Sequence, residues 1–114
     1  MNKIIIMLTL VFLTISSITA KEKTPTKTET IKVWGNCEMC ESTIEKATKK
    51  VAGVVKADWD VDKKKLTVTY KPSETTNETI QKAIAAVGYD TENFTADDKA
   101  YANLHACCQY DRKK

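Results

Sequence analysis

The chain has 114 residues, of which 42% are hydrophobic, and this is enough for one small domain with a single modest core. The net charge of +3 is too small to favour nucleic acid or a membrane surface as a partner, and Arg112 is the single arginine of the sequence. Four cysteines remain as the most informative residues.

Residues 1–20 have the pattern of a secretory signal peptide. A short basic start precedes an apolar run from Ile4 to Ile15, and small residues follow up to Ala20, after which we expect cleavage. The apolar run is short for a membrane span, so a retained anchor is the alternative and no stable membrane insertion is expected after cleavage. Export predicts a periplasmic location, where thiols tend to oxidise.

Residues 21–29 are rich in Lys and Thr and are expected to form a flexible linker. Ile31 and Val33 then alternate with polar residues, which predicts a half-buried strand. From Glu38 the spacing changes to that of a helix, which Gly53 is expected to end. The predicted buried face of this helix carries Cys40, Ile44, Ala47 and Val51.

A hairpin and a second helix are predicted next. The alternating residues are Val55, Ala57, Trp59 and Val61 in one strand, and Leu66, Val68 and Tyr70 in the other. Residues 62–65 form the polar turn between them. Thr75 and Glu78 resemble a capping box at the start of a helix that Gly88 ends. Ile80, Ile84 and Val87 mark its buried face.

Residues 89–95 are expected to form a last strand at the edge of the sheet. The predicted order is therefore an α+β, ferredoxin-like βαββαβ domain over residues 30–95, with a four-stranded antiparallel sheet covered on one face by two helices. A short helical and irregular tail, residues 96–114, should follow. Asp97 and Asp98 are candidate caps for a helix in this tail that runs to Leu104.

Cys37 and Cys40 form a Cys-x-x-Cys pair at the start of the first helix. Backbone amides at a helix start carry partial positive charge, which favours thiolate. Two thiolates can hold Cu(I) or Hg(II), whereas structural zinc usually takes four ligands. Because two thiolates leave the coordination incomplete, such a site suits transfer of the ion to a partner.

The same spacing also occurs in redox proteins, so a thiol–disulfide oxidoreductase is an alternative. A thioredoxin-like domain needs a longer mixed sheet and a proline that faces the pair, and neither Pro25 nor Pro72 is well placed for this. A disulfide, or a zinc site built from all four cysteines, is the other alternative.

Residues 30–95 resemble the heavy-metal-associated domain, the family of copper chaperones, the periplasmic mercury-binding protein and the N-terminal domains of metal-pumping P-type ATPases. The resemblance rests on four segments: Cys37–Cys40, Thr43–Ala47, Gly53–Val54 and Gly88–Asp90. It implies that Cys37 and Cys40 carry the ion and that Tyr89 lies near it. It also implies a partner such as a metal-transporting P-type ATPase or a component of an efflux or uptake system, and we expect a monomer.

The sequence departs from the family two residues before the first cysteine, where Gly35 stands in place of the usual methionine. The loop is therefore expected to be held differently, with Trp34 filling some of the space. Met39, between the two cysteines, is expected to face away from the ion or to cover the site.

The tail carries a second cluster of soft ligands, with His105 followed by Cys107 and Cys108. We expect it to fold towards the first pair and supply a third or fourth thiolate, or to form a Cu(I) site of its own. A vicinal disulfide or idle thiols are the alternative. His105 ranks below both cysteines as a ligand, because a single histidine near a chain end is usually solvated.

The sequence thus predicts an exported protein that binds and transfers a soft metal ion and is not an enzyme. Cu(I) is the first choice of ion, Hg(II) the nearest alternative and Zn(II) a further one. The rival functions are those of a periplasmic oxidoreductase and of a passive module docked on a membrane pump.

Overall fold

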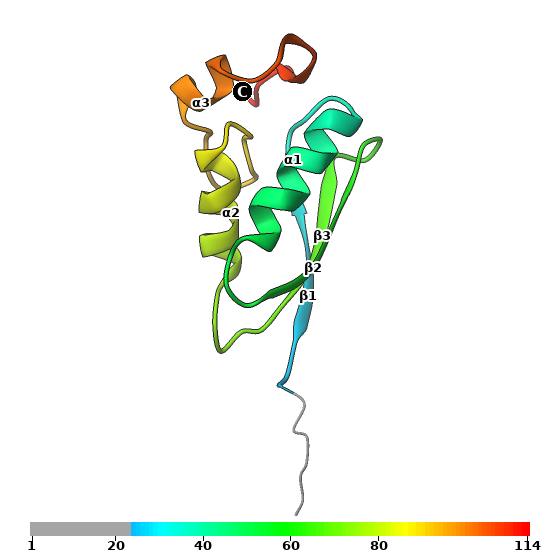
Figure 1. The fold of residues 1–114 in the computed structure, drawn as a ribbon, viewed down its shortest axis with the longest axis vertical. Coiled ribbons are helices and arrows are strands. Elements are labelled where there is room, and N and C mark those ends of the chain that lie inside the picture. The colour runs from blue at the N-terminus through cyan, green and yellow to red at the C-terminus, as the bar shows by residue number, and fades with distance from the viewer. Residues whose placement is uncertain (1–23) are drawn as a thin grey trace, which may run out of the picture.

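The computed structural model describes residues 24–114, so the predicted signal peptide and the first residues of the linker lie outside the described residues. Figure 1 shows a sheet with α1 and α2 on one face and the C-terminal tail at one end. The elements are β1 (Lys27–Lys32), α1 (Glu38–Lys49), β2 (Val54–Asp60), β3 (Lys65–Tyr70), α2 (Asn77–Ala86), α3 (Asp98–Ala102) and the 3-10 turn η2 (Ala106–Cys108). No helix in the described part of the chain is long and apolar enough to cross a membrane.

The sheet is antiparallel with strand order β1-β3-β2. Leu66 in the central strand pairs with Ile31 on one side and Trp59 on the other, and all three are buried. Alternate residues therefore face the helices, as the spacing predicts. A register shift between Val54 and Lys56 interrupts this alternation at the start of β2. Val55 is therefore exposed instead of buried.

The fourth strand expected over residues 89–95 is reduced to a single antiparallel bridge between Val33 and Thr91. The chain turns back at once, because the backbone amide of Thr91 donates to the carbonyl of Phe94 at 2.8 Å. In the described residues the prediction of a four-stranded sheet is therefore wrong in its last strand, while the βαββα order before it is confirmed. The first strand also begins at Lys27, so residues 27–29 of the expected linker pair with β3.

Two details of α2 differ from the prediction. Its N-cap is Thr76, whose hydroxyl accepts from the amide of Thr79 at 3.1 Å. Thr75, the predicted cap, is buried in the preceding turn, where its amide donates to the carbonyl of Lys71. Val87 is exposed because the helix ends at Ala86 and the chain leaves the helical path there.

The core lies between the sheet and the two long helices. Its fully buried side chains include Ile31, Val33, Ile44, Trp59, Leu66, Val68, Ile80, Ile84 and Tyr89. These apolar groups leave water on folding, which is the main favourable contribution to the stability of a small domain.

The tail folds back over the end of the domain where α1 begins (Figure 1). The Asp97 carboxylate caps α3 by accepting from the amide of Ala100 at 2.9 Å, as predicted, but the helix ends at Ala102 and not at Leu104. Farther along, the hydroxyl of Tyr110 accepts from the Asp90 amide at 2.8 Å and donates to the Gly88 carbonyl at 2.7 Å. The tail is thus tied to the loop that follows α2.

Candidate metal centre

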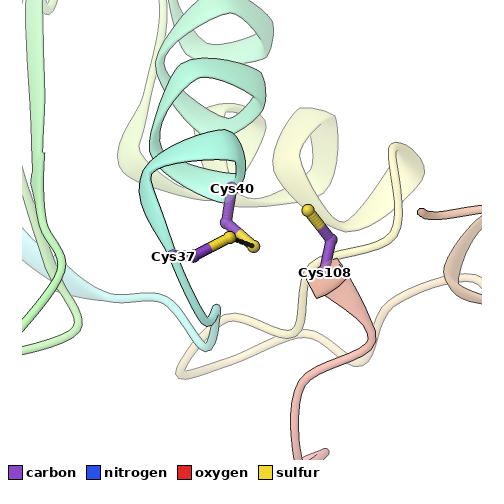
Figure 2. Close-up of side chains that lie close together, drawn as sticks. All are labelled: Cys37, Cys40 and Cys108. Atoms are coloured by element: carbon purple, nitrogen blue, oxygen red, sulfur yellow. Dashed lines mark hydrogen bonds between the residues drawn. The ribbon is translucent and has the colours of Figure 1, made fainter. Parts of the chain in front are cut away.

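Three cysteines form a cluster at the start of α1. The sulfur atoms of Cys37, Cys40 and Cys108 all lie within 4.8 Å of one another. Those of Cys37 and Cys40 are 4.0 Å apart. Figure 2 shows these two side chains pointing towards each other from α1 and the residue before it, with Cys108 coming from the tail. Cys40 and Cys108 are buried, whereas Cys37 is partly exposed.

Cys37 occupies the N-cap position of α1. Its backbone is extended and its side chain makes no capping hydrogen bond; the thiol donates instead to the carbonyl of Cys107 at 3.7 Å. The backbone amides of Cys40 and Met39 lower the pKa of the Cys37 thiol. An accessible thiol with a lowered pKa is the group expected to meet an incoming soft ion first.

Cys108 has the opposite character. Burial and, to a smaller extent, the nearby Cys40 raise the pKa of its thiol to about 12. In the absence of an ion this thiol therefore stays protonated near neutral pH. A bound cation reverses that preference because it displaces the proton from the sulfur.

The hydroxyl of Tyr89 is buried and has no hydrogen-bond partner within normal distance among residues 24–114. It faces Cys40 and Cys108, and burial together with these two groups raises its pKa. The ring stacks on Tyr110, with centroids 5.6 Å apart and an interplanar angle of 17°. A hydroxyl in this place can donate a hydrogen bond to a thiolate.

Comparison with known proteins gives a consistent assignment. The model of the heavy-metal-associated domain matches residues 36–90. The copper chaperone CopZ of Staphylococcus epidermidis is 38% identical over 63 residues, which are 54% of this chain and 93% of that protein. The chain belongs to the heavy-metal-associated domain family.

Other members of the family are similar over the same part of the chain. The periplasmic component of the mercuric transport protein from Salmonella typhi is 33% identical over 78 residues, covering 68% of this chain and 86% of that protein. The zinc-transporting ATPase of Synechocystis is 39% identical over 69 residues, 60% of this chain but 10% of the ATPase. The crystal structure of oxidised MerP from Ralstonia metallidurans superimposes with a TM-score of 0.57 at 35% identity, covering 60% of this chain and 96% of that one.

The family match ends before the tail, so Cys107 and Cys108 lie beyond it. Cys107 is exposed, and its sulfur contacts the sulfur of Met39 at 3.4 Å. The sulfurs of Cys107 and Cys108 are 4.0 Å apart. Its carbonyl accepts from the Asn36 side chain at 3.0 Å. The structure therefore brings Cys108 into the sulfur cluster but leaves Cys107 and the exposed His105 outside it.

Trp59, and not only Trp34 as expected from the sequence, fills the space beside Gly35. A Cβ atom at position 35 would lie 2.8 Å from the Trp59 ring, so this ring occupies the space beside the loop. The Trp59 indole nitrogen also donates to the carbonyl of Val33 at 3.0 Å. Trp34 lies half-buried, with the ammonium groups of Lys32 and Lys113 over its ring.

A second group of ligand atoms lies elsewhere, where the carboxylates of Glu41, Glu45 and Asp58 approach within 4.8 Å. Glu45 accepts from the backbone amide of Trp59 at 2.8 Å, which gives it a structural role. Burial and the neighbouring Glu45 raise the pKa of Glu41. This group contains no soft ligand, so the sulfur cluster is the candidate site for a soft ion.

Proposed function

We propose that this protein binds a soft metal ion, Cu(I) in the first place, at Cys37 and Cys40 and passes it to the thiolates of a partner. The observation that carries the proposal is the pair of sulfurs 4.0 Å apart at the start of α1. Family membership supports it, since the relatives include a copper chaperone and a periplasmic component of mercuric transport.

The chemistry needs no catalytic group. Each thiol that binds the ion releases one proton to solvent, and the metal keeps its oxidation state. In transfer, a partner's thiolate attacks the ion, a thiolate of this protein leaves, and the freed sulfur takes up a proton. The partial exposure of Cys37 gives the partner a point of attack.

Thiolate chemistry favours Cu(I) and Hg(II) over Zn(II) at this site. Both ions accept two or three thiolates, whereas Zn(II) in closed sites usually takes four ligands. Relatives of both the copper and the mercuric type cover most of their own length in the match. Hg(II) therefore remains the alternative ion, and a thiol–disulfide oxidoreductase the alternative function.

We further propose that the protein works in the periplasm, because residues 1–20 have the pattern of a signal peptide. A metal-transporting P-type ATPase or a component of an efflux or uptake system is the proposed partner. The similarity to a domain of a zinc-transporting ATPase supports a transporter of this class. Fractionation of cells, followed by N-terminal sequencing of the mature protein, tests the export.

The deciding experiment is a Cu(I) titration of the fully reduced protein under anaerobic conditions against a chromophoric competitor. We expect tight binding of a single ion per chain, and loss of this binding in the Cys37→Ser/Cys40→Ser double variant. Insulin reduction is measured in parallel. Reductase turnover without tight Cu(I) binding contradicts the proposal and favours the oxidoreductase.

A further inference from the structure

We propose that Cys108 is the third thiolate ligand of the ion, so that the C-terminal tail is a built-in part of the metal site. This inference rests on the proposed function, since it assumes that Cys37 and Cys40 hold a soft ion. It goes beyond the family, whose match ends at residue 90.

The distances favour three ligands. Metal–thiolate bonds of about 2.3 Å place sulfurs about 4.6 Å apart in a linear two-ligand site and about 4.0 Å apart in a trigonal one. The sulfurs of Cys37 and Cys40 are 4.0 Å apart, which is the trigonal spacing. The sulfur of Cys108 lies within 4.8 Å of both, so a shift of less than about 1 Å completes the triangle.

Tyr89 is a second and independent indication. Its hydroxyl is fully buried and faces Cys40 and Cys108. Among residues 24–114 it has no hydrogen-bond partner. A buried donor without an acceptor is costly, and thiolates at this place would accept its hydrogen bond. The bond would also offset part of the negative charge of three thiolates, together with the amides at the start of α1.

The tail is held firmly enough for Cys108 to serve as a ligand. Tyr110, two residues after Cys108, is buried and fixed by hydrogen bonds to the backbone of Gly88 and Asp90. Arg112 adds an ion pair with Asp90. Because the thiol of Cys108 is already buried and positioned, little ordering is needed when the ion binds.

A third thiolate changes how the protein handles its ion. Binding releases a third proton to solvent and holds the ion more tightly than two thiolates do. A partner's thiolate can replace Cys37 first, on the exposed side of the site, while Cys40 and Cys108 keep the ion. The tail therefore slows spontaneous loss and still permits stepwise exchange.

The adjacent Cys107 supplies a matched control. It is exposed, its sulfur contacts Met39, and it lies outside the sulfur cluster. Cys107→Ser and Cys108→Ser remove the same atom from neighbouring residues. Their comparison separates the buried ligand from a general effect of losing a thiol in the tail.

The test measures metal coordination in the full mature chain, reduced and loaded with one equivalent of Cu(I) or Hg(II). X-ray absorption should show three sulfur ligands in the wild type and in Cys107→Ser, and two in Cys108→Ser. Loss of a supporting contact around a metal typically weakens affinity about 10- to 100-fold, so loss of a direct ligand in Cys108→Ser should cost at least this much. Cys107→Ser should bind as the wild type does.

Three results would overturn the inference in distinguishable ways. Two sulfur ligands in the loaded wild type exclude Cys108 as a ligand and leave the proposed function standing, and this measurement needs no variant that must fold. Equal loss of affinity in both serine variants contradicts the choice of Cys108 over Cys107. Failure of the reduced wild type to bind either ion contradicts the proposed function itself.

Discussion

Asp90 and Arg112 form a two-point ion pair between the loop after α2 and the end of the tail. The two oxygens of the Asp90 carboxylate accept from the Arg112 side chain at 2.9 and 3.0 Å. Asp90 is fully buried, whereas Arg112 keeps about a quarter of its side chain exposed. Since Tyr89 precedes Asp90 and Cys108 lies four residues before Arg112, this pair joins the two parts of the candidate metal centre.

Asp90→Asn should destabilise the protein by about 3 kcal/mol, because it removes the buried charged partner of a partly buried guanidinium. It also weakens the acceptor for the amides of Ala96 and Lys113, which lie 2.7 and 3.1 Å from the carboxylate. The free energy of unfolding in urea measures this loss.

Asp98→Asn is the control, because Asp98 also contacts Arg112, at 3.1 Å, but is 93% exposed. An exposed ion pair contributes about 0–1 kcal/mol, so this variant should unfold close to the wild type. Equal losses in the two variants would show that burial of Asp90 does not decide the strength of the pair.

The Asp90 carboxylate should make the free energy of unfolding depend on pH. Burial alone would raise the pKa of Asp90, but Arg112 and the amides of Ala96 and Lys113 hold the pKa below its ordinary value of 3.8. The folded state therefore binds this proton less readily than the unfolded chain. The contribution of Asp90 is present above about pH 4 and is lost as the pH falls through the lowered pKa.

Urea midpoints between neutral pH and strongly acidic pH check this dependence. The gap in stability between the wild type and Asp90→Asn should stay constant above about pH 5 and narrow below about pH 4. A gap that is unchanged at the acid end would mean that another group carries the acid sensitivity.

The periodic parts of the chain could be predicted from sequence because burial follows spacing there. Ile31 and Val33 are buried on alternate positions, and Cys40 and Ile44 are buried one helical turn apart. Thr48 was missed on the same helix face because it is polar. Its hydroxyl donates to the Ile44 carbonyl at 2.7 Å, so its burial leaves no polar group unpaired.

The tail could be predicted only in part. The density of soft ligands indicated that it would fold towards the first cysteine pair, but spacing cannot tell which of two adjacent cysteines turns inwards. That choice depends on Tyr110 and Arg112, which fix the backbone after Cys108 through contacts with residues about 20 positions earlier. Such contacts leave no periodic pattern in the sequence.

Gly35→Ala should destabilise the protein by about 1–3 kcal/mol, because the added Cβ would lie 2.8 Å from two atoms of the Trp59 ring. Trp59→Phe removes the outer part of that ring, although it also costs the hydrogen bond to the Val33 carbonyl. The same glycine substitution should therefore cost less in a Trp59→Phe background.

A double-mutant cycle by chemical unfolding measures this coupling. Additive losses would mean that Gly35 is needed for backbone reasons and not for the space that Trp59 occupies.

Tyr89→Phe should separate the stability of the fold from the stability of the loaded metal site. In the ion-free protein the Tyr89 hydroxyl is buried and finds no hydrogen-bond partner among residues 24–114, so its removal should leave the free energy of unfolding unchanged or slightly higher. In the loaded protein the same change removes a donor to the thiolates of Cys40 and Cys108. Loss of such a supporting contact should weaken affinity about 10-fold, mainly through faster release of the ion.

Thermal unfolding with and without Cu(I), together with release rates to a competing chelator, measures both effects. Destabilisation of the ion-free protein with an unchanged release rate would place the role of Tyr89 in the core, through its stacking on Tyr110, and not at the metal.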